Sequence, residues 1–191
     1  IQFKYVQPSP TPNFATNSVE VKGFYEPASE CGGDWMYYNQ VHGKINLWIG
    51  DATGHGVSAA LVTSAARSAS QVLQEFPSLK PHEVIGMLNR AIHQTAKSKV
   101  MMTFFFATFD PETRILSYCN ASHDPPYVFP YNNGDPIRKS HIEPLMDKTG
   151  KRLGEDPAAE YETVDVHLQD GDLIEKSCKI FVVGTRPSTK K

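Results

Sequence analysis

Hydrophobic and polar residues alternate in several short stretches of the chain, and hydrophobic residues recur every three or four positions in two longer ones. The alternation predicts strands over residues 19–25, 35–41 and 44–50. The three-to-four spacing predicts one helix over residues 57–76 and a second beginning near Pro81, because it gathers hydrophobic side chains on one side of a helix.

Each predicted helix has a hydrophobic stripe that we expect to be buried. The first stripe comprises Val57, Leu61, Ala65, Ala69, Val72 and Phe76, and the second Val84, Ile85, Leu88, Ala91 and Ile92. His82 and His93 lie on or near the second helix and are expected to face solvent. Further strand patterns cover 102–109, 114–119, 127–131, 136–139, 160–168 and 180–183, with hairpin turns at 110–113 and 132–135.

The first predicted hairpin carries large hydrophobic residues on both faces. Met36, Tyr38, Leu47 and Ile49 share one face, and Trp35, Tyr37 and Trp48 share the other. Such a sheet has to be covered twice, and a second sheet on one side with helices on the other would do so. Because strands both precede and follow the helical pair, the pattern favours an α+β fold over a repeating βαβ sheet.

Two acidic residues end the strands of this hairpin. If residues 42–43 form a two-residue loop, opposed residues have numbers that sum to 85, so Asp34 faces Asp51. Two carboxylates with Cβ atoms about 5 Å apart repel by roughly 3 kcal/mol at an effective dielectric near 20. Either one carboxyl group is protonated or a cation lies between them; the alternative is that both acids merely accept turn hydrogen bonds.

A cation held there has a clear chemical use. Carboxylate, carbonyl and water ligands suit Mg²⁺ or Mn²⁺. Such an ion polarises a phosphoryl oxygen and activates water for in-line attack, so that no protein nucleophile is required. The pair therefore favours phosphate-ester hydrolysis.

Longer motifs surround both acids. At GGDW (32–35) and IGDATGHGVSAAL (49–61) the sequence resembles the metal-dependent protein phosphatases of the PPM type, in their bacterial SpoIIE/RsbU branch. The similarity continues through FYEPASE (24–30), TFFFATFDPETRILSYCNASHDPPYVF (103–129) and LQDGDLI (168–174).

The resemblance implies a four-layer α-β-β-α sandwich of two antiparallel sheets flanked by helices, with its C-terminal part abbreviated here. It also implies a two-metal site for Mn²⁺ or Mg²⁺ at the edge between the sheets. Asp34 and Asp51 match catalytic metal ligands, and the main-chain carbonyl of Ala52 matches a further ligand. The implied activity is that of a protein serine/threonine phosphatase acting on a phosphorylated regulator such as an anti-sigma-factor antagonist.

One part of the family pattern is missing. A later metal-ligand aspartate should fall at position 179, which is Lys179, and the helical segment and final aspartate that should follow are absent. Two interpretations of the missing ligands remain open. The chain is either an altered enzyme that binds one metal weakly, or a pseudophosphatase that serves as a protein-binding or signal-relay module.

Charge and composition limit the classes of binding partner that the sequence supports. A net charge of −2 gives no case for nucleic acid or an anionic membrane surface, and no apolar run is long enough to cross a bilayer. Cys31, Cys119 and Cys178 are scattered and odd in number, which favours free thiols and a cytoplasmic location. Because the sequence starts at Ile1 without a methionine, we expect that it can be part of a longer protein, with an upstream sensor domain as a candidate partner. The resemblance adds a homodimer as a further candidate.

We divide the chain into an irregular lead-in (1–18), a phosphatase domain (19–184) and a basic tail (185–191). Thr53 is interpreted as a helix cap or an aspartate-orienting hydroxyl, and His55 as part of the turn before the first helix. His123 precedes Asp124 and two prolines, and is interpreted as part of a rigid loop without a catalytic role.

Overall fold

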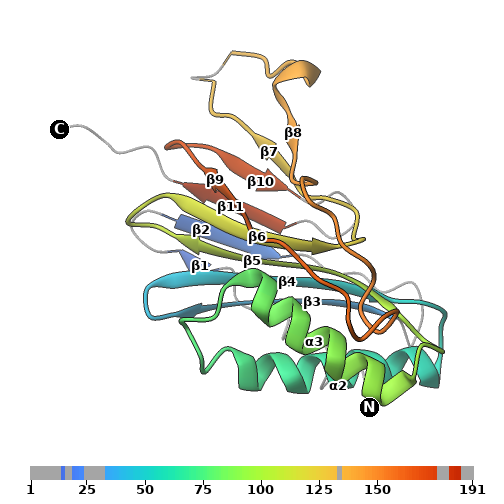
Figure 1. The fold of residues 1–191 in the computed structure, drawn as a ribbon. Coiled ribbons are helices and arrows are strands. Elements are labelled where there is room, and N and C mark those ends of the chain that lie inside the picture. Colours follow the sequence, from blue (N-terminus) through green and yellow to red (C-terminus); the bar gives the residue numbers. More distant parts are fainter. Residues whose placement is uncertain (1–13, 16–18, 24–32, 133–134, 176–180, 186–191) are drawn as a thin grey trace.

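Two antiparallel sheets lie face to face in the computed structural model of the protein, and two helices cover the outer face of one of them (Figure 1). The structure describes residues 14–15, 19–23, 33–132, 135–175 and 181–185. Within these residues, both helices lie on the same sheet, so the second helical layer of the expected four-layer sandwich has no counterpart there. The α+β class with two antiparallel sheets is confirmed.

The elements follow one another as strands, a helical pair and further strands. They are β1 (Phe14–Ala15), β2 (Val19–Gly23), β3 (Asp34–Val41), β4 (Lys44–Ala52), α2 (Val57–Leu73), α3 (Pro81–Ala96), β5 (Met102–Asp110), β6 (Ile115–Ala121), β7 (Tyr127–Phe129), the 3₁₀ helix η1 (Lys139–His141), β8 (Glu143–Pro144), β9 (Val164–His167), β10 (Leu173–Glu175) and β11 (Phe181–Thr185). One sheet has the order β3-β4-β5-β6-β9, and the other the order β1-β2-β11-β10-β7-β8.

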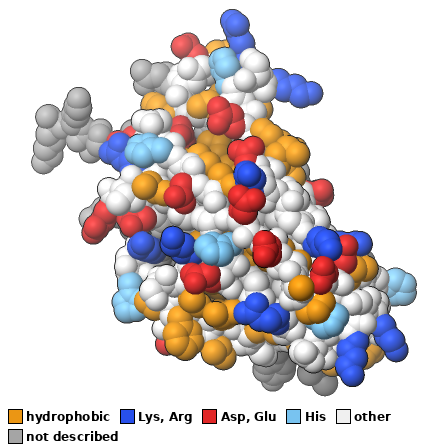
Figure 2. Space-filling model, viewed as in Figure 1, with side chains coloured by type: hydrophobic (Ala, Val, Ile, Leu, Met, Phe, Trp, Pro, Cys, Tyr) orange, Lys and Arg blue, Asp and Glu red, His pale blue; other side chains and the backbone are white. Residues whose placement is uncertain are grey.

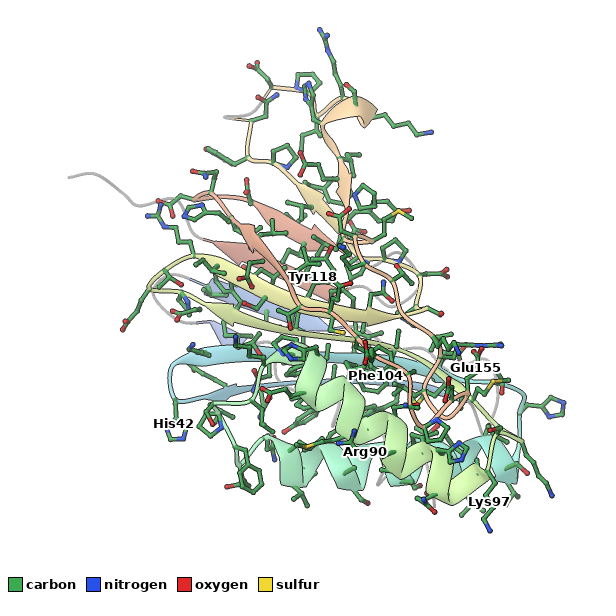
Figure 3. The ribbon with its side chains drawn as sticks, viewed as in Figure 1. His42, Arg90, Lys97, Phe104, Tyr118 and Glu155 are labelled. Atoms are coloured by element: carbon green, nitrogen blue, oxygen red, sulfur yellow. The ribbon has the colours of Figure 1, made fainter. Side chains whose placement is uncertain are left out.

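A hydrophobic core lies on each side of the five-stranded sheet. The core under the helices includes Trp35, Trp48, Phe104 and Phe106, and the core between the sheets includes Met36, Leu47, Ile49, Phe105, Tyr118 and, from the second sheet, Val21, Val128 and Ile174. Successive strand residues point to opposite faces, which produces this division. Figure 3 shows Phe104 on the helix side and Tyr118 on the side of the second sheet. The prediction that the first hairpin is covered on both faces is confirmed.

The buried face of α2 is not the predicted one. Its buried residues are Ala59, Ala60, Val62, Thr63, Ala66, Ser70 and Leu73. Val57, Leu61 and Val72 from the predicted stripe are 73%, 61% and 61% exposed. Ala65 and Ala69 of the predicted stripe are half-buried against the core. Mostly small side chains let the helix lie close to the sheet, and Val57, Leu61 and Val72 are left outside; Figure 2 shows hydrophobic side chains gathered at the lower left, over the helical layer.

Helix α3 buries the side that was predicted. Val84, Ile85, Leu88 and Ile92 are buried, and Ala91 is half-buried. His82 and His93 on this helix were expected to face solvent, and they do not.

Both of these histidines are half-buried, because each is held by a later segment of the chain. His82 Nδ1 lies 2.8 Å from Thr163 Oγ1, and His93 Nδ1 lies 3.1 Å from the Gly154 carbonyl oxygen. Their expected exposure was therefore wrong.

Three strand predictions also change. The turn after β5 starts one residue later than predicted, at 111, and Arg114 takes a φ of 60° within it. No strand forms over 136–139, because residues 136–138 lead into η1, which begins at Lys139; β7 pairs with β8 and β10 instead. Within the lead-in predicted to be irregular, β1 pairs with β2.

The thiol of Cys119 is free and buried, as its interpretation as an ordinary buried cysteine predicted. Burial raises the pKa of this thiol to about 12, which keeps it protonated and unreactive. Cys31 and Cys178 lie outside the described residues. In the part of the chain that the structure describes, neither helix has the length and hydrophobicity needed to cross a membrane.

Candidate metal centre

The loop between β3 and β4 fixes the position of the two predicted acids. His42 and Gly43 have φ values of 48° and 82°, the positive pair that a tight two-residue hairpin loop of type I′ requires. The strands pair without interruption, so that Asp34 lies directly opposite Asp51. The predicted register is confirmed.

Both acids point toward the open end of the space between the sheets. Asp34 shares a face of β3 with Met36, and Asp51 shares a face of β4 with Ile49, because alternate strand residues point the same way. Met36 and Ile49 belong to the core between the sheets. Asp34 is half-buried and Asp51 is exposed. The pair thus lies at the edge between the sheets, within reach of solvent.

Gly33 allows a close main-chain approach next to this pair. The Ala52 N–H donates to the Gly33 carbonyl over 3.0 Å, and the Thr63 hydroxyl of α2 donates to the same carbonyl over 3.1 Å. A Cβ atom at position 33 would lie only 2.2 Å from the Ala52 carbonyl oxygen. Only glycine fits there, and it keeps the Ala52 carbonyl beside the two acids.

The glycine-rich turn leads from Asp51 into α2. Gly54 and Gly56 have φ values of 88° and 74°, which favour glycine, and exposed His55 lies between them. Gly56 occupies the N-cap position of α2 without a side-chain cap. Thr53 is therefore not the helix cap: its Oγ1 accepts the Met101 N–H over 3.0 Å and ties the turn to β5.

Thr103 and His123 lie beside the acids, although the sequence indicated no role for Thr103 and only a loop position for His123. Thr103 of β5 lies directly opposite Asp51, and its Oγ1 is 2.8 Å from His123 Nδ1. Asn120 holds His123 by accepting its N–H over 2.8 Å and donating to its carbonyl over 3.0 Å. Ser122, with a φ of 55°, bends the chain between them. The β4–β5 register joins strands separated by two helices, so that no local signal indicated this neighbourhood.

The donors fit a hard divalent cation in kind. Two facing carboxylates and an adjacent carbonyl are oxygen ligands, which Mg²⁺ and Mn²⁺ prefer, and water completes such sites. Among the residues that the structure describes, no three His, Cys, Asp or Glu side chains gather closely enough to hold a metal. Lys179, where the resemblance places a later ligand, lies outside them.

The same fold and motifs occur in known proteins. The family described as Stage II sporulation protein E (SpoIIE) matches residues 42–175, which is more than half of the chain. The chain belongs to the SpoIIE family. The resemblance to PPM-type phosphatases of the SpoIIE/RsbU branch is thereby confirmed, and the matched segment contains Asp51 and Ala52 but begins after Asp34.

Two relatives from Bacillus subtilis are named as phosphatases. This SpoIIE-family chain is 26% identical to phosphoserine phosphatase RsbU over 157 residues, which are 82% of the chain and 44% of RsbU. It is 25% identical to phosphoserine phosphatase RsbP over 170 residues, 86% of the chain and 40% of RsbP. The chain thus spans less than half the length of these relatives.

Solved structures share the fold at lower identity. The RsbU and RsbW domains of Rv1364c from Mycobacterium tuberculosis match with a TM-score of 0.66 and 23% identity, over 82% of this chain and 42% of that one. The catalytic domain of the phosphatase PstP, solved with two manganese ions, matches with a TM-score of 0.58 and 12% identity, over 82% of this chain and 75% of that one. These likenesses show that the two sheets form a PPM-type fold.

Proposed function

We propose that this SpoIIE-family chain is a metal-dependent phosphatase domain that hydrolyses phosphoserine or phosphothreonine in a regulatory protein. The observation that carries the proposal is the direct pairing of Asp34 with Asp51 at the solvent-accessible edge between the sheets. The names of RsbU and RsbP, both phosphoserine phosphatases, support the substrate class. An anti-sigma-factor antagonist is one such regulator.

Each residue of the site has a defined task. Asp34 and Asp51 would hold Mn²⁺ or Mg²⁺ between their carboxylates, and the Ala52 carbonyl would add a neutral ligand. The chemistry that such an ion supplies is polarisation of the phosphoryl group and activation of water. Gly33 leaves room for the Ala52 carbonyl, and the Thr63 hydroxyl fixes the main chain at Gly33 against α2. The manganese ions of PstP support the choice of metal.

A second candidate function is a binding module of phosphatase fold that turns over poorly or not at all. It is favoured by the small donor set, since the described residues contain no cluster of three acidic, histidine or cysteine side chains. This module would recognise the same phosphorylated regulator without hydrolysing it.

An assay of phosphoaryl-ester hydrolysis with and without Mn²⁺ separates the two functions. For an enzyme we expect Mn²⁺-dependent turnover that Asp51→Ala lowers at least about 100-fold, because a metal supplies several kcal/mol of transition-state stabilisation. Asp165→Asn is the matched control, a carboxylate on β9 of the same sheet that accepts the Ser117 hydroxyl.

The activity of the unmodified chain decides between the two functions. If it shows no metal-dependent turnover, the proposal that it is an enzyme is rejected. A calorimetric Mn²⁺ titration would then test the binding module, which is supported if the ion binds and Asp34→Asn abolishes binding. Failure to bind the ion rejects the metal site itself.

The surroundings of this domain are further proposals. We place the domain at residues 19–184, between the lead-in and the basic tail, in the cytoplasm. Its proposed partners are the phosphorylated regulator, an upstream sensor domain and a second copy of the chain. The RsbU and RsbW domains of Rv1364c, which occur in one protein, support a role within a multidomain regulator.

A further inference from the structure

Three polar side chains form a row across β3, β4 and β5 at the edge between the sheets. Asp34 is opposite Asp51, and Asp51 is opposite Thr103, so all three point to the same side. The next residue of β5 on this side is Phe105, which is 1% exposed in the core between the sheets. Thr103 is therefore the last polar position before that core, next to the carboxylate of Asp51.

The hydroxyl of Thr103 is itself held in place. It lies 2.8 Å from Nδ1 of His123, a side chain only 9% exposed, and 3.4 Å from the main-chain carbonyl oxygen of Asp51. His123 is fixed in turn by Asn120, which is 1% exposed. These contacts form a chain from Asn120 through His123 and Thr103 to the main chain at Asp51.

The direction of the hydrogen bonds follows from the number of hydrogens available. A threonine hydroxyl has one hydrogen and can both accept and donate. If neutral His123 carries its hydrogen on Nδ1, it donates to Thr103, and the hydroxyl hydrogen is donated to the main-chain carbonyl oxygen of Asp51. His123 is buried, and a buried polar side chain costs free energy unless it is hydrogen-bonded.

We propose that Thr103 and His123 are a positioning pair that orients Asp51 for metal binding. This inference rests on the proposed function. Thr103 holds the main chain at Asp51, which sets where the Asp51 carboxylate lies. Loss of the contacts that position a metal ligand typically weakens metal binding 10–100-fold. Neither residue touches the substrate or the ion; both act through Asp51.

Matched variants separate positioning from packing. Thr103→Val keeps the shape of the side chain and removes the hydroxyl, whereas Thr103→Ser keeps the hydroxyl. His123→Leu removes the ring N–H, whereas His123→Asn retains an N–H donor near the Nδ1 position. Thr108→Val is the control, a residue of β5 whose hydroxyl donates to Asn46 over 2.9 Å away from the acids.

The measurements are Mn²⁺ affinity by calorimetry, the Mn²⁺ dependence of phosphoaryl-ester hydrolysis, and a thermal melt in EDTA. We expect Thr103→Val and His123→Leu to weaken Mn²⁺ binding about 10-fold or more. Thr103→Ser, His123→Asn and Thr108→Val should stay within about threefold of the wild type. Because the pair acts as one unit, the double variant Thr103→Val/His123→Leu should be no weaker than the worse single variant.

Two results would overturn the inference while leaving the proposed function intact. One is a folded Thr103→Val protein that binds Mn²⁺ as well as Thr108→Val does. The other is Thr103→Ser binding as weakly as Thr103→Val, which would indicate a packing role. If the wild-type protein does not bind Mn²⁺, both the metal site and this inference are overturned.

Discussion

At the scale of single residues, the main feature is an unfavourable contact built into the sheet. Asp34 and Asp51 face each other across β3 and β4, so their charges repel when both are ionised. Gly33 and the type I′ loop keep this geometry in place. A cation between the two carboxylates would offset this repulsion more than water does.

Asp34→Asn should change stability in opposite directions with and without metal. In EDTA, removing the repulsion should raise the free energy of unfolding by up to about 1 kcal/mol, because solvent screens a partly exposed pair. With Mn²⁺ at 100 times its Kd, the wild type should gain about 2.7 kcal/mol that the variant lacks. Urea unfolding in both conditions measures this, and the same order of stability in both would contradict a metal site.

Cys119 should make stability fall at alkaline pH. Burial raises the pKa of its thiol from 9.0 to about 12, so the folded protein keeps a proton that the unfolded chain loses. This contribution is complete below pH 9 and is lost as the pH rises toward 12, at up to about 1.4 kcal/mol per pH unit. Between pH 8 and 10.5, Cys119→Ala should therefore lose about 2 kcal/mol less than the wild type in urea unfolding under reductant. Equal losses would show that the thiol ionises freely in the folded state.

At the scale of elements, α2 is packed through its small side chains. Ala59 and Ala66 are 0% exposed, while Leu61 is 61% exposed. The close approach brings the Thr63 hydroxyl within hydrogen-bonding distance of the Gly33 carbonyl, which links the helix to the candidate site. The helix therefore depends on residues that contribute little hydrophobic surface.

Substitutions on α2 should show this inverted pattern. Ala59→Leu should lower the free energy of unfolding by about 1–3 kcal/mol, because the added side chain has no room. Leu61→Gln should change it by no more than about 0.5 kcal/mol, since the residue is exposed. Chemical denaturation of both variants tests this, and a large loss for Leu61→Gln with none for Ala59→Leu would restore the predicted stripe.

At the scale of the whole molecule, two cores share one sheet. Strand β5 sends Phe105 into the core between the sheets and Phe106 into the core under the helices. Trp35 and Trp48 both lie in the core under the helices. Because the same strands line both cores, we expect the described sheets and helices to unfold as one unit.

Phe105→Ala and Phe106→Ala should each lower the free energy of unfolding by about 3–5 kcal/mol. Tryptophan fluorescence reports on the helix side of the sheet. In Phe105→Ala, the unfolding midpoint measured by fluorescence should nevertheless shift by as much as the midpoint measured by far-ultraviolet circular dichroism. Separate midpoints for the two signals in the Phe105 variant would show that the cores unfold independently.

The sequence by itself determined the features that depend on neighbours along the chain. The loop at 42–43 and the alternation on both sides of it fix the pairing of Asp34 with Asp51, because a tight turn sets the register of its own hairpin. The two hydrophobic faces of that hairpin likewise required two covering layers, and both are present.

Only the tertiary structure decided which elements that are distant in the sequence lie in contact. Periodicity located α2 but not its buried face, since close packing against the sheet selects small side chains over large ones. It also could not place Thr103 opposite Asp51 or His123 beside it, because β4 and β5 are separated by both helices. Pairing between distant strands is set by the packing of the whole domain, and no local pattern encodes it.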